Sequence, residues 1–176
     1  MKVILDPGKQ EASAVPYFAL DRYDLVGKTV LDVPEDFRWT TNTVDWDTLT
    51  IVTDMTRVRA ARWAEVKAKR EVVQSGGCDT PAGRVQTDAG SRAFINGLVL
   101  SALAAEQVGA PFSDDFTLSN DLTVEVSGPQ AIALGQAVGA FISAAHAHSL
   151  RLRAAIEGAN TPEEIAAIDI DNDWPT

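Results

Sequence analysis

Residues 127–157 read SGPQAIALGQAVGAFISAAHAHSLRLRAAIE, and this stretch decides the fold. Ser127 followed by Gln130 is a capping-box pattern, which predicts the start of a helix. Apolar residues then recur at three- and four-residue spacing, as on the buried face of a helix; they are Leu134, Val138, Phe141, Ala145, Leu152 and Ile156. The pattern predicts the longest helix of the chain, which ends near Glu157 because Gly158 and Asn160 follow.

Two further helices precede this stretch. Strong helix formers predict a helix from Asp54 or Thr56 to about Gln74, and the sequence Ser75-Gly76-Gly77 ends it. Thr87 or Asp88 caps the next helix, which runs to about Gly109. Its apolar residues lie on two adjacent rows, so we expect a mostly buried helix; the rows are Phe94, Leu98 and Ala102, and Ile95, Val99 and Leu103.

The segments around these helices carry turn and strand signals. Residues 75–86 predict a turn followed by a short strand. Apolar and polar residues alternate on both sides of Asn120-Asp121, which predicts a β-hairpin with one apolar face over residues 116–126. Thr161-Pro162-Glu163-Glu164 is a second capping box, which predicts a short closing helix before an acidic tail.

The sequence of residues 1–54 predicts strands and loops. Short apolar runs are separated by Asp, Pro and Gly; the runs are Val3-Ile4-Leu5, Tyr17-Phe18-Ala19-Leu20, Thr29-Val30-Leu31 and Leu49-Thr50-Ile51-Val52. The segment is too short to bury a large core alone, so it forms a small β module or extended arms that pair with a neighbouring chain. We therefore expect an α+β protein, with residues 1–54 as a β-rich attachment module and residues 55–176 as a three-helix domain with a β-hairpin.

The charge of the chain is large and uneven. Hydrophobic residues make up 45% of the 176 residues, which is enough for a sizeable core, and the formal net charge is −10. Such a surface repels DNA, so we expect no nucleic-acid partner. Residues 55–75 nevertheless hold six basic and two acidic side chains. A basic helix in an acidic chain predicts an electrostatic contact, either within the chain or with another protein.

Six residues are candidates for docking a protein partner. Arg59, Trp63, Lys67 and Arg70 share one strip of the predicted basic helix, and an acidic protein surface suits that strip better than nucleic acid does. Trp39 and Trp46 are expected to anchor the N-terminal segment and to be exposed, which suits either a permanent or a temporary partner.

A stripe of small residues follows the long helix. Ala131, Gly135, Gly139 and Ser143 repeat at four-residue spacing, which lets another helix approach closely. That helix could belong to a second subunit, so the stripe is a candidate helix-packing or oligomer interface. Its Gly-x-x-x-Gly spacing also occurs in membrane helices, but Ala, Gly, Ser, Gln and His insert poorly, so we expect no membrane insertion. The apolar run at residues 3–5 is too short for a signal peptide.

Residues that could carry chemistry are few. His146 and His148 point about 200° apart on a helix, so they cannot hold one metal together, although an ion on a symmetry axis stays open. Cys78, the one cysteine, lies in a Gly-rich turn and is expected to be a surface thiol rather than a nucleophile.

Acidic clusters are the remaining candidates. Asp169, Asp171 and Asp173 alternate as at the start of a calcium loop, but the glycine and the distal glutamate are missing. The pairs Asp45/Asp47 and Asp114/Asp115 show no aromatic platform nearby, which argues against a glycosidase. The residues therefore predict no catalytic site, no metal and no cofactor.

Several pieces between Trp63 and Trp174 stand out by their order and spacing: residues 63–70, Gln86 to Arg92 with Ile95 and Gly97, Pro111-Phe112-Ser113, residues 131–138, His146, residues 152–156 and residues 161–169. On these pieces the stretch resembles a domain of unknown function that is common at the C-termini of bacteriophage and prophage tail and tail-fibre-region proteins. The departures are a missing tryptophan in the first hairpin strand and residues 1–54, which match nothing.

The resemblance implies a structural component of the virion tail, in the distal tail, baseplate or tail-fibre region. Such a protein would be assembled in the host cytoplasm with other phage tail proteins, as a homo-oligomer with a trimer favoured. The family carries no assigned catalytic residues. Two alternatives stay open: a tail-fibre assembly chaperone that is absent from the mature virion, and an enzyme acting on host surface polymer.

Overall fold

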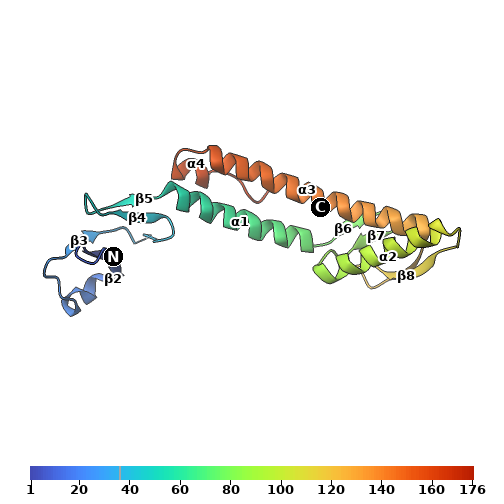
Figure 1. The fold of residues 1–176 in the computed structure, drawn as a ribbon, viewed down its shortest axis with the longest axis horizontal. Coiled ribbons are helices and arrows are strands. Elements are labelled where there is room, and N and C mark those ends of the chain that lie inside the picture. Colours follow the sequence, from blue (N-terminus) through green and yellow to red (C-terminus); the bar gives the residue numbers. More distant parts are fainter. Residues whose placement is uncertain (36) are drawn as a thin grey trace. The chain divides into compact units, whose positions relative to one another are not determined.

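The computed structural model describes residues 1–35 and 37–176 and has the expected α+β class (Figure 1). It contains two compact units. Unit 1 comprises Met1–Arg62 with Ala159–Ala166, and unit 2 comprises Trp63–Gly158 with Ala167–Thr176. Helix α1 (Met55–Ser75) contributes residues to both. Whether residues 1–54 form an independent domain stays a prediction.

Unit 1 is built mainly from short strands. β1 (Lys2–Asp6) is the central strand of an antiparallel sheet and lies between β2 (Glu11–Val15) and β3 (Thr29–Asp32). β4 (Asn42–Asp45) and β5 (Thr50–Thr53) form a separate hairpin. Three of the four apolar runs predicted from the sequence therefore correspond to β1, β3 and β5. β2 and β4 were not predicted, because neither contains a run of consecutive large apolar residues.

The fourth apolar run is not a strand. Tyr17–Arg22 forms a 3₁₀ helix, η1. Pro16, with a φ of −60°, precedes it, and the Ala19 amide donates a hydrogen bond of 3.0 Å to the Pro16 carbonyl. Tyr17 is 71% exposed. An aromatic run without alternation offers a sheet no single apolar face, so a tight turn after proline prevails.

The long helices lie where their caps predict them. The Asp88 carboxylate accepts hydrogen bonds from the Gly90 and Ser91 amides and begins α2 (Ala89–Gln107). The pKa of Asp88 is lowered because its carboxylate accepts the Ser91 hydroxyl and these amides. The Gln130 side chain accepts hydrogen bonds from the Ser127 amide and hydroxyl at 2.8 and 2.7 Å. α3 (Gly128–Gly158) follows directly and has 31 residues.

The short helix α4 (Pro162–Ala166) begins at the second predicted capping box, in unit 1. The Glu164 amide donates to the Thr161 hydroxyl at 3.1 Å. In return the Glu164 carboxylate accepts the Asn160 amide at 2.7 Å. The first bond satisfies an amide that the first turn of a helix leaves without a partner, and the second ties the residue before the cap to the helix.

Two hairpins lie between the helices of unit 2. β6 (Cys78–Thr80) pairs with β7 (Gly83–Val85), where a single strand was expected. Gly77 precedes this hairpin with a φ of +86°, and a side chain there would meet the Val85 carbonyl at 2.7 Å. β8 (Ser113–Thr117) pairs with β9 (Thr123–Ser127), as predicted around Asn120-Asp121.

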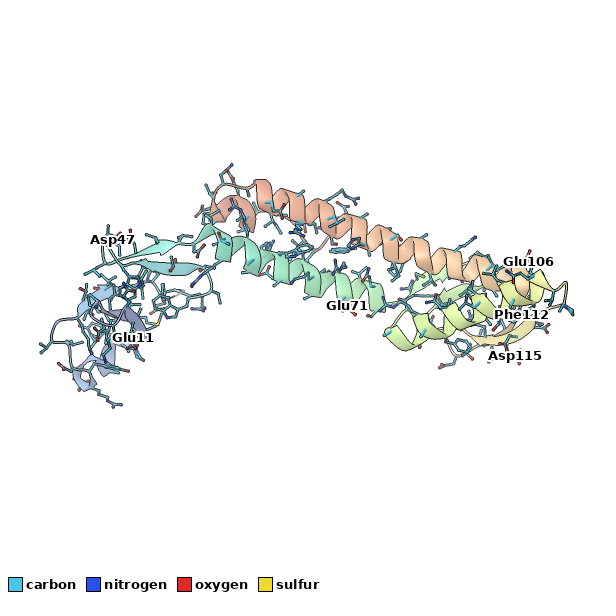
Figure 2. All side chains as sticks on the ribbon, in the orientation of Figure 1. Glu11, Asp47, Glu71, Glu106, Phe112 and Asp115 are labelled. Atoms are coloured by element: carbon cyan, nitrogen blue, oxygen red, sulfur yellow. The ribbon has the colours of Figure 1, made fainter. Side chains whose placement is uncertain are left out.

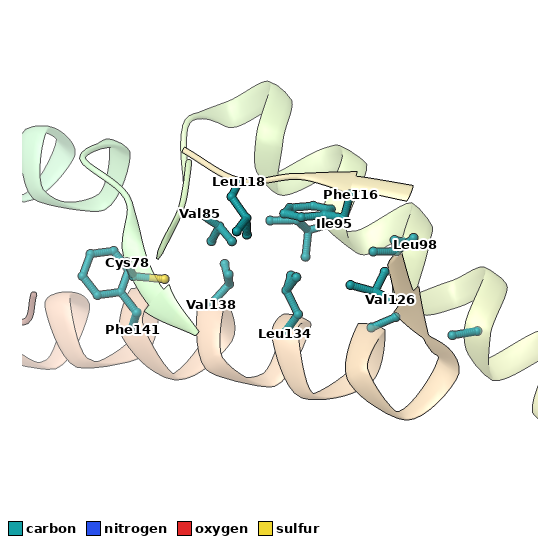
Figure 3. Close-up of a cluster of buried hydrophobic side chains, with 12 residues drawn as sticks. Cys78, Val85, Ile95, Leu98, Phe116, Leu118, Val126, Leu134, Val138 and Phe141 are labelled. Atoms are coloured by element: carbon teal, nitrogen blue, oxygen red, sulfur yellow. The ribbon is translucent and has the colours of Figure 1, made fainter. Parts of the chain in front are cut away.

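One cluster of buried side chains, the main core, joins both hairpins of unit 2 to α2 and α3 (Figure 3). Leu134 and Val138 of α3 lie opposite Val85, Ile95 and Phe116. The other labelled members are Cys78, Leu98, Leu118, Val126 and Phe141. All six residues of the stripe predicted for the long helix are buried.

A second cluster, the C-terminal cluster, joins α1 to the far half of α3. Val66, Leu152 and Ile156 are buried at its centre. Residues Ile168, Ile170 and Trp174 of the C-terminal segment pack against them, together with Trp63. The Trp174 indole donates a hydrogen bond of 2.9 Å to the Ile170 carbonyl, which holds the segment in a turn.

The burial predicted for α2 is partly wrong. Ile95, Leu98 and Ala102 are buried, but Phe94 is 55% exposed and Leu103 is 39% exposed. Only one face of α2 packs in the main core, and this face crosses both predicted rows, so Phe94 of the first row and Leu103 of the second lie largely in solvent.

Candidate functional site

The two tryptophans of unit 1 serve its own core. Trp39 meets Phe37 edge-to-face, with ring centroids 4.8 Å apart, and Trp46 packs in the same cluster with Val3 and Leu5. The Arg57 guanidinium donates to the Trp39 and Asn42 carbonyls, at 2.9 Å each. Both tryptophans are half-buried, so their expected exposure is wrong. A role for them in docking a partner stays a prediction.

Four exposed large apolar side chains of unit 1 lie elsewhere, in and directly after η1. Tyr17 is 71% exposed and Val26 is 86% exposed, with Tyr23 and Leu25 also exposed between them. We name residues 17–26 the aromatic loop. Sequence reasoning missed it because the aromatic run was interpreted as a strand that buries itself.

The basic strip of α1 docks largely onto its own chain. In unit 1 the Arg59 guanidinium donates to the Ala159 carbonyl at 2.7 Å. In unit 2 Trp63 packs in the C-terminal cluster, and the Arg153 guanidinium lies 5.5 Å from the centroid of its ring. Arg70 donates to the Ser149 hydroxyl at 3.3 Å. Lys67 is exposed.

The neighbouring Lys69 of α1 forms an ion pair within unit 2. Its ammonium lies 2.8 Å from the Asp171 carboxylate of the acidic tail. The sequence left open whether the basic helix contacts its own chain or another protein, and the structure contains the contact within the chain. Whether any residue of the strip also contacts a partner stays a prediction.

The stripe of small residues on α3 divides into two parts. Ala131 is buried, and a β-carbon built on Gly135 would overlap the Val99 Cγ2 of α2, so this end allows α2 and α3 to approach closely. At Gly139 a β-carbon would meet nothing within 4 Å, and Ser143 is exposed. The close helix partner of Gly135 belongs to the same chain, whereas a contact of Gly139 and Ser143 with another subunit stays a prediction.

Cys78 is not the expected surface thiol. Its side chain is fully buried in the main core, beside Phe141 (Figure 3). Burial raises the pKa of the Cys78 thiol, so the reactive thiolate is disfavoured. The Gly-rich context suggested exposure, but the strand that follows Gly77 turns the side chain inward.

The two histidines lie in different surroundings, as their spacing predicts. His148 is buried and meets Trp174 edge-to-face at 4.6 Å, and the Arg151 guanidinium lies 3.1 Å from its Nδ1. His146 is exposed, and its Nδ1 lies 3.4 Å from Arg70. Both rings therefore take part in packing or hydrogen-bonding contacts, but the buried Nε2 of His148 has no hydrogen-bond partner among the described residues.

The acidic tail folds on itself and on α1. The Asp169 carboxylate accepts the Asp171 amide at 2.9 Å and the Asn172 side-chain amide at 2.6 Å. Asp171 pairs with Lys69, as described above. Among residues 1–35 and 37–176, no group of three or more His, Cys, Asp or Glu side chains is placed to hold a metal ion.

An aromatic ring lies beside one carboxylate pair, contrary to expectation. Phe94 and Phe116 line a hollow of about 340 Å³ together with Asp115, and their rings stack at 6.0 Å. The Asp115 side chain is labelled in Figure 2. A second hollow, of about 500 Å³, includes Glu106 and Phe112. Each of these linings contains one carboxylate, whereas a hollow of about 590 Å³ in unit 1 contains two, Asp32 and Glu163. The absence of an enzymatic activity stays a prediction.

Membrane spanning is not indicated in the part of the chain that the structure describes. None of its helices combines the length and the apolar character that crossing a bilayer requires.

The fold and these sites define an α+β protein in which most residues singled out from the sequence form packing contacts within the chain. The chain belongs to the family described as a domain of unknown function, DUF4376, which matches residues 57–172. Comparisons with curated proteins and with solved structures found no match. An association of this chain with phage tails stays a prediction.

Proposed function

We propose that this protein is a non-enzymatic structural component of a bacteriophage tail, in the distal tail, baseplate or tail-fibre region. The resemblance of residues 63–174 to domains of tail proteins supports the location. Membership of a family without an assigned reaction is consistent with an assembly role. The partners would be other tail proteins and further copies of the same chain, assembled in the host cytoplasm.

The observation that carries the assembly role is an uncharged helix surface that faces solvent. From Gly128 to Leu150, α3 contains no Asp, Glu, Lys or Arg. One flank packs in the main core, but Gly139, Ser143 and Leu150 on the other flank are exposed. Solvent-facing surfaces without charge are typical of places where another protein binds.

Mass spectrometry of gradient-purified particles tests the proposal, with copy number measured against the major tail protein. A fixed multiple per particle is the expected result, and three or six copies would indicate the tail tip or fibres. Absence of the chain from particles of a phage that expresses it would overturn the structural role.

The aromatic loop favours a second candidate, a tail-fibre assembly chaperone. A chaperone needs an apolar surface that binds its client for a time, and Tyr17, Tyr23, Leu25 and Val26 offer one within ten residues. The same experiment separates the candidates. A chaperone is made during infection and co-purifies with fibre subunits, but it is missing from finished particles.

A further inference from the structure

The hollow of about 500 Å³ in unit 2 lies between the last turns of α2 and the first turns of α3. From α2 it is lined by Ala102 and Glu106, one helical turn apart. From α3 it is lined by Ile132 and Gln136 at the same spacing, and residues 110–112 complete it with the start of α3. Its lining is mostly apolar, and its volume is that of cavities that hold a ligand.

Backbone contacts hold the lining of this hollow in place. The Ala110 amide donates to the Ala105 carbonyl at 2.9 Å, which turns the chain back at the end of α2. The Gly128 amide donates to the Phe112 carbonyl at 3.2 Å. A β-carbon built on Gly128 would lie 3.6 Å from the Phe112 Cβ and 4.0 Å from the Ala102 Cβ, so α3 begins close to both. A site that is ordered before binding loses little conformational entropy when it is filled.

The lining contains a single charged side chain, that of Glu106, which is labelled in Figure 2. The last turn of α2 has no basic residue. Among residues 1–35 and 37–176, no side chain forms an ion pair with the Glu106 carboxylate. The negative end of the α2 dipole lies at the same place. A cation is therefore the charge that complements this hollow.

The start of α3 gives an anion little to bind. The Ser127 amide donates to the Gln130 side chain at 2.8 Å. The Gly128 amide is bonded to Phe112, and Pro129 has no amide hydrogen. These positions of the α3 N-terminus are thus occupied within the chain, whereas the Glu106 carboxylate would repel an anion.

The hollow is continuous with the uncharged flank of α3 that carries the proposed function. Its lining includes Ala133 and Gln136. From Gln136, steps of three and four residues lead to Gly139 and then to Ser143, which are exposed on that flank. A protein that covers the flank therefore also reaches the hollow.

We propose that this hollow binds a segment of another tail protein that inserts a basic side chain between apolar neighbours. The Glu106 carboxylate pairs with the ammonium or guanidinium group, and the apolar lining covers the side-chain stem and the neighbouring residues. The source of the segment rests on the proposed function, whereas the chemistry of the hollow does not.

Titration of the ¹⁵N-labelled full chain tests the proposal, with three acetylated peptide amides as probes: Leu-Lys-Leu, Leu-Gln-Leu and Leu-Glu-Leu. Amide chemical shifts should change around the hollow, at Ile132 and Ala133 among others. The lysine peptide should bind most tightly and the glutamate peptide least, because only the central charge differs.

Two variants with matched controls identify the groups that bind. Glu106→Gln should weaken binding of the lysine peptide by roughly 5-fold and remove its preference over the glutamine peptide. Glu71→Gln is its control, because Glu71 is exposed on α1 outside the hollow. Ala133→Leu fills the hollow and should weaken all three peptides. Ala155→Leu is the control for added volume, since Ala155 is exposed on the second half of α3. Circular dichroism verifies that the four variants fold.

Three results would overturn the proposal: equal binding of the three peptides, chemical-shift changes away from the hollow, or no binding at millimolar peptide. Tighter binding of phenethylamine than of the lysine peptide would also overturn it, because that result indicates a site for a small molecule. The particle experiment fails separately. A chain that is absent from particles contradicts the tail role, whereas a chain that is present but binds no peptide contradicts the hollow alone.

Discussion

The two halves of α3 hold their neighbours by different means. The first half fills the main core, where Leu134 is fully buried among side chains from two hairpins and α2. The second half carries the smaller C-terminal cluster, whose surroundings are polar and aromatic contacts such as Lys69 with Asp171 and His148 with Trp174. The first half of α3 is thus held by a buried apolar core, whereas the second half is held by a smaller apolar cluster with an ion pair and an aromatic contact around it.

The largest expected difference between the halves comes from truncating a leucine in each. Leu134→Ala should lower the free energy of unfolding by about 4 kcal/mol, within the range for enclosed core leucines. Leu152→Ala should cost nearer 2 kcal/mol, because Leu152 is 8% exposed and its smaller cluster can close around the gap. Urea denaturation of both variants measures the difference. Equal losses would show that the C-terminal cluster is as tightly enclosed as the main core.

A matched pair of glycine substitutions probes the same helix from its small-residue stripe. Gly135→Leu should destabilise the protein by about 1–3 kcal/mol, because its side chain would overlap Val99 and force α2 away. Gly139→Leu has open space and should gain up to about 1 kcal/mol from helix propensity. Thermal unfolding compares them. A loss of oligomer mass in Gly139→Leu would place Gly139 in a contact between subunits.

The ion pair at the C-terminal cluster should matter less. Asp171→Asn removes the partner of Lys69, and because Asp171 is 73% exposed the loss should stay below about 1 kcal/mol. Added salt should reduce the difference from the parent chain, since exposed pairs are screened. Asp173→Asn is the control, as Asp173 is exposed in the same tail. A salt-independent loss would show that Asp171 acts through packing and not through charge.

Ionisation of the Cys78 thiol in the main core should have the smallest effect on the free energy of unfolding at neutral pH. The pKa of the folded thiol is raised by burial above that of the unfolded chain. The stabilising difference is therefore fully present below the unfolded pKa and is lost as the pH rises through the folded pKa. Stability measured from pH 7 upward should fall more steeply in the parent than in Cys78→Ala. Parallel profiles would contradict a raised pKa.

Helix periodicity and caps were readable from the sequence because they depend on local chemistry. The six buried residues of the α3 stripe, the Asp88 cap and the Ser127–Gln130 contact follow from spacing alone. Burial that depends on tertiary contacts could not be predicted from the sequence. Cys78 and the two tryptophans of unit 1 illustrate this, because residues distant in the sequence cover, fully or in part, side chains that were expected to be exposed.

The candidate interaction sites were predicted less well, for a related reason. An apolar row on a helix predicts burial, but it does not say whether the same chain provides the cover. On α2 the main core covers parts of both rows and leaves Phe94 of one row and Leu103 of the other exposed. Likewise, the basic strip of α1 was open to an internal or an external partner, and only the fold shows Lys69 paired with the tail.

The sequence distances within the two clusters bear on the order in which unit 2 folds. Contacts of the C-terminal cluster join segments such as Lys69 and Asp171, which lie 102 residues apart. The main core joins neighbours along the chain, from β6 to the first half of α3. Closing shorter loops costs less entropy, so the main core is expected in the folding nucleus and the pairing of α1 with the C-terminal segment should come late. Leu134→Ala should then slow refolding, whereas Leu152→Ala should mainly speed unfolding.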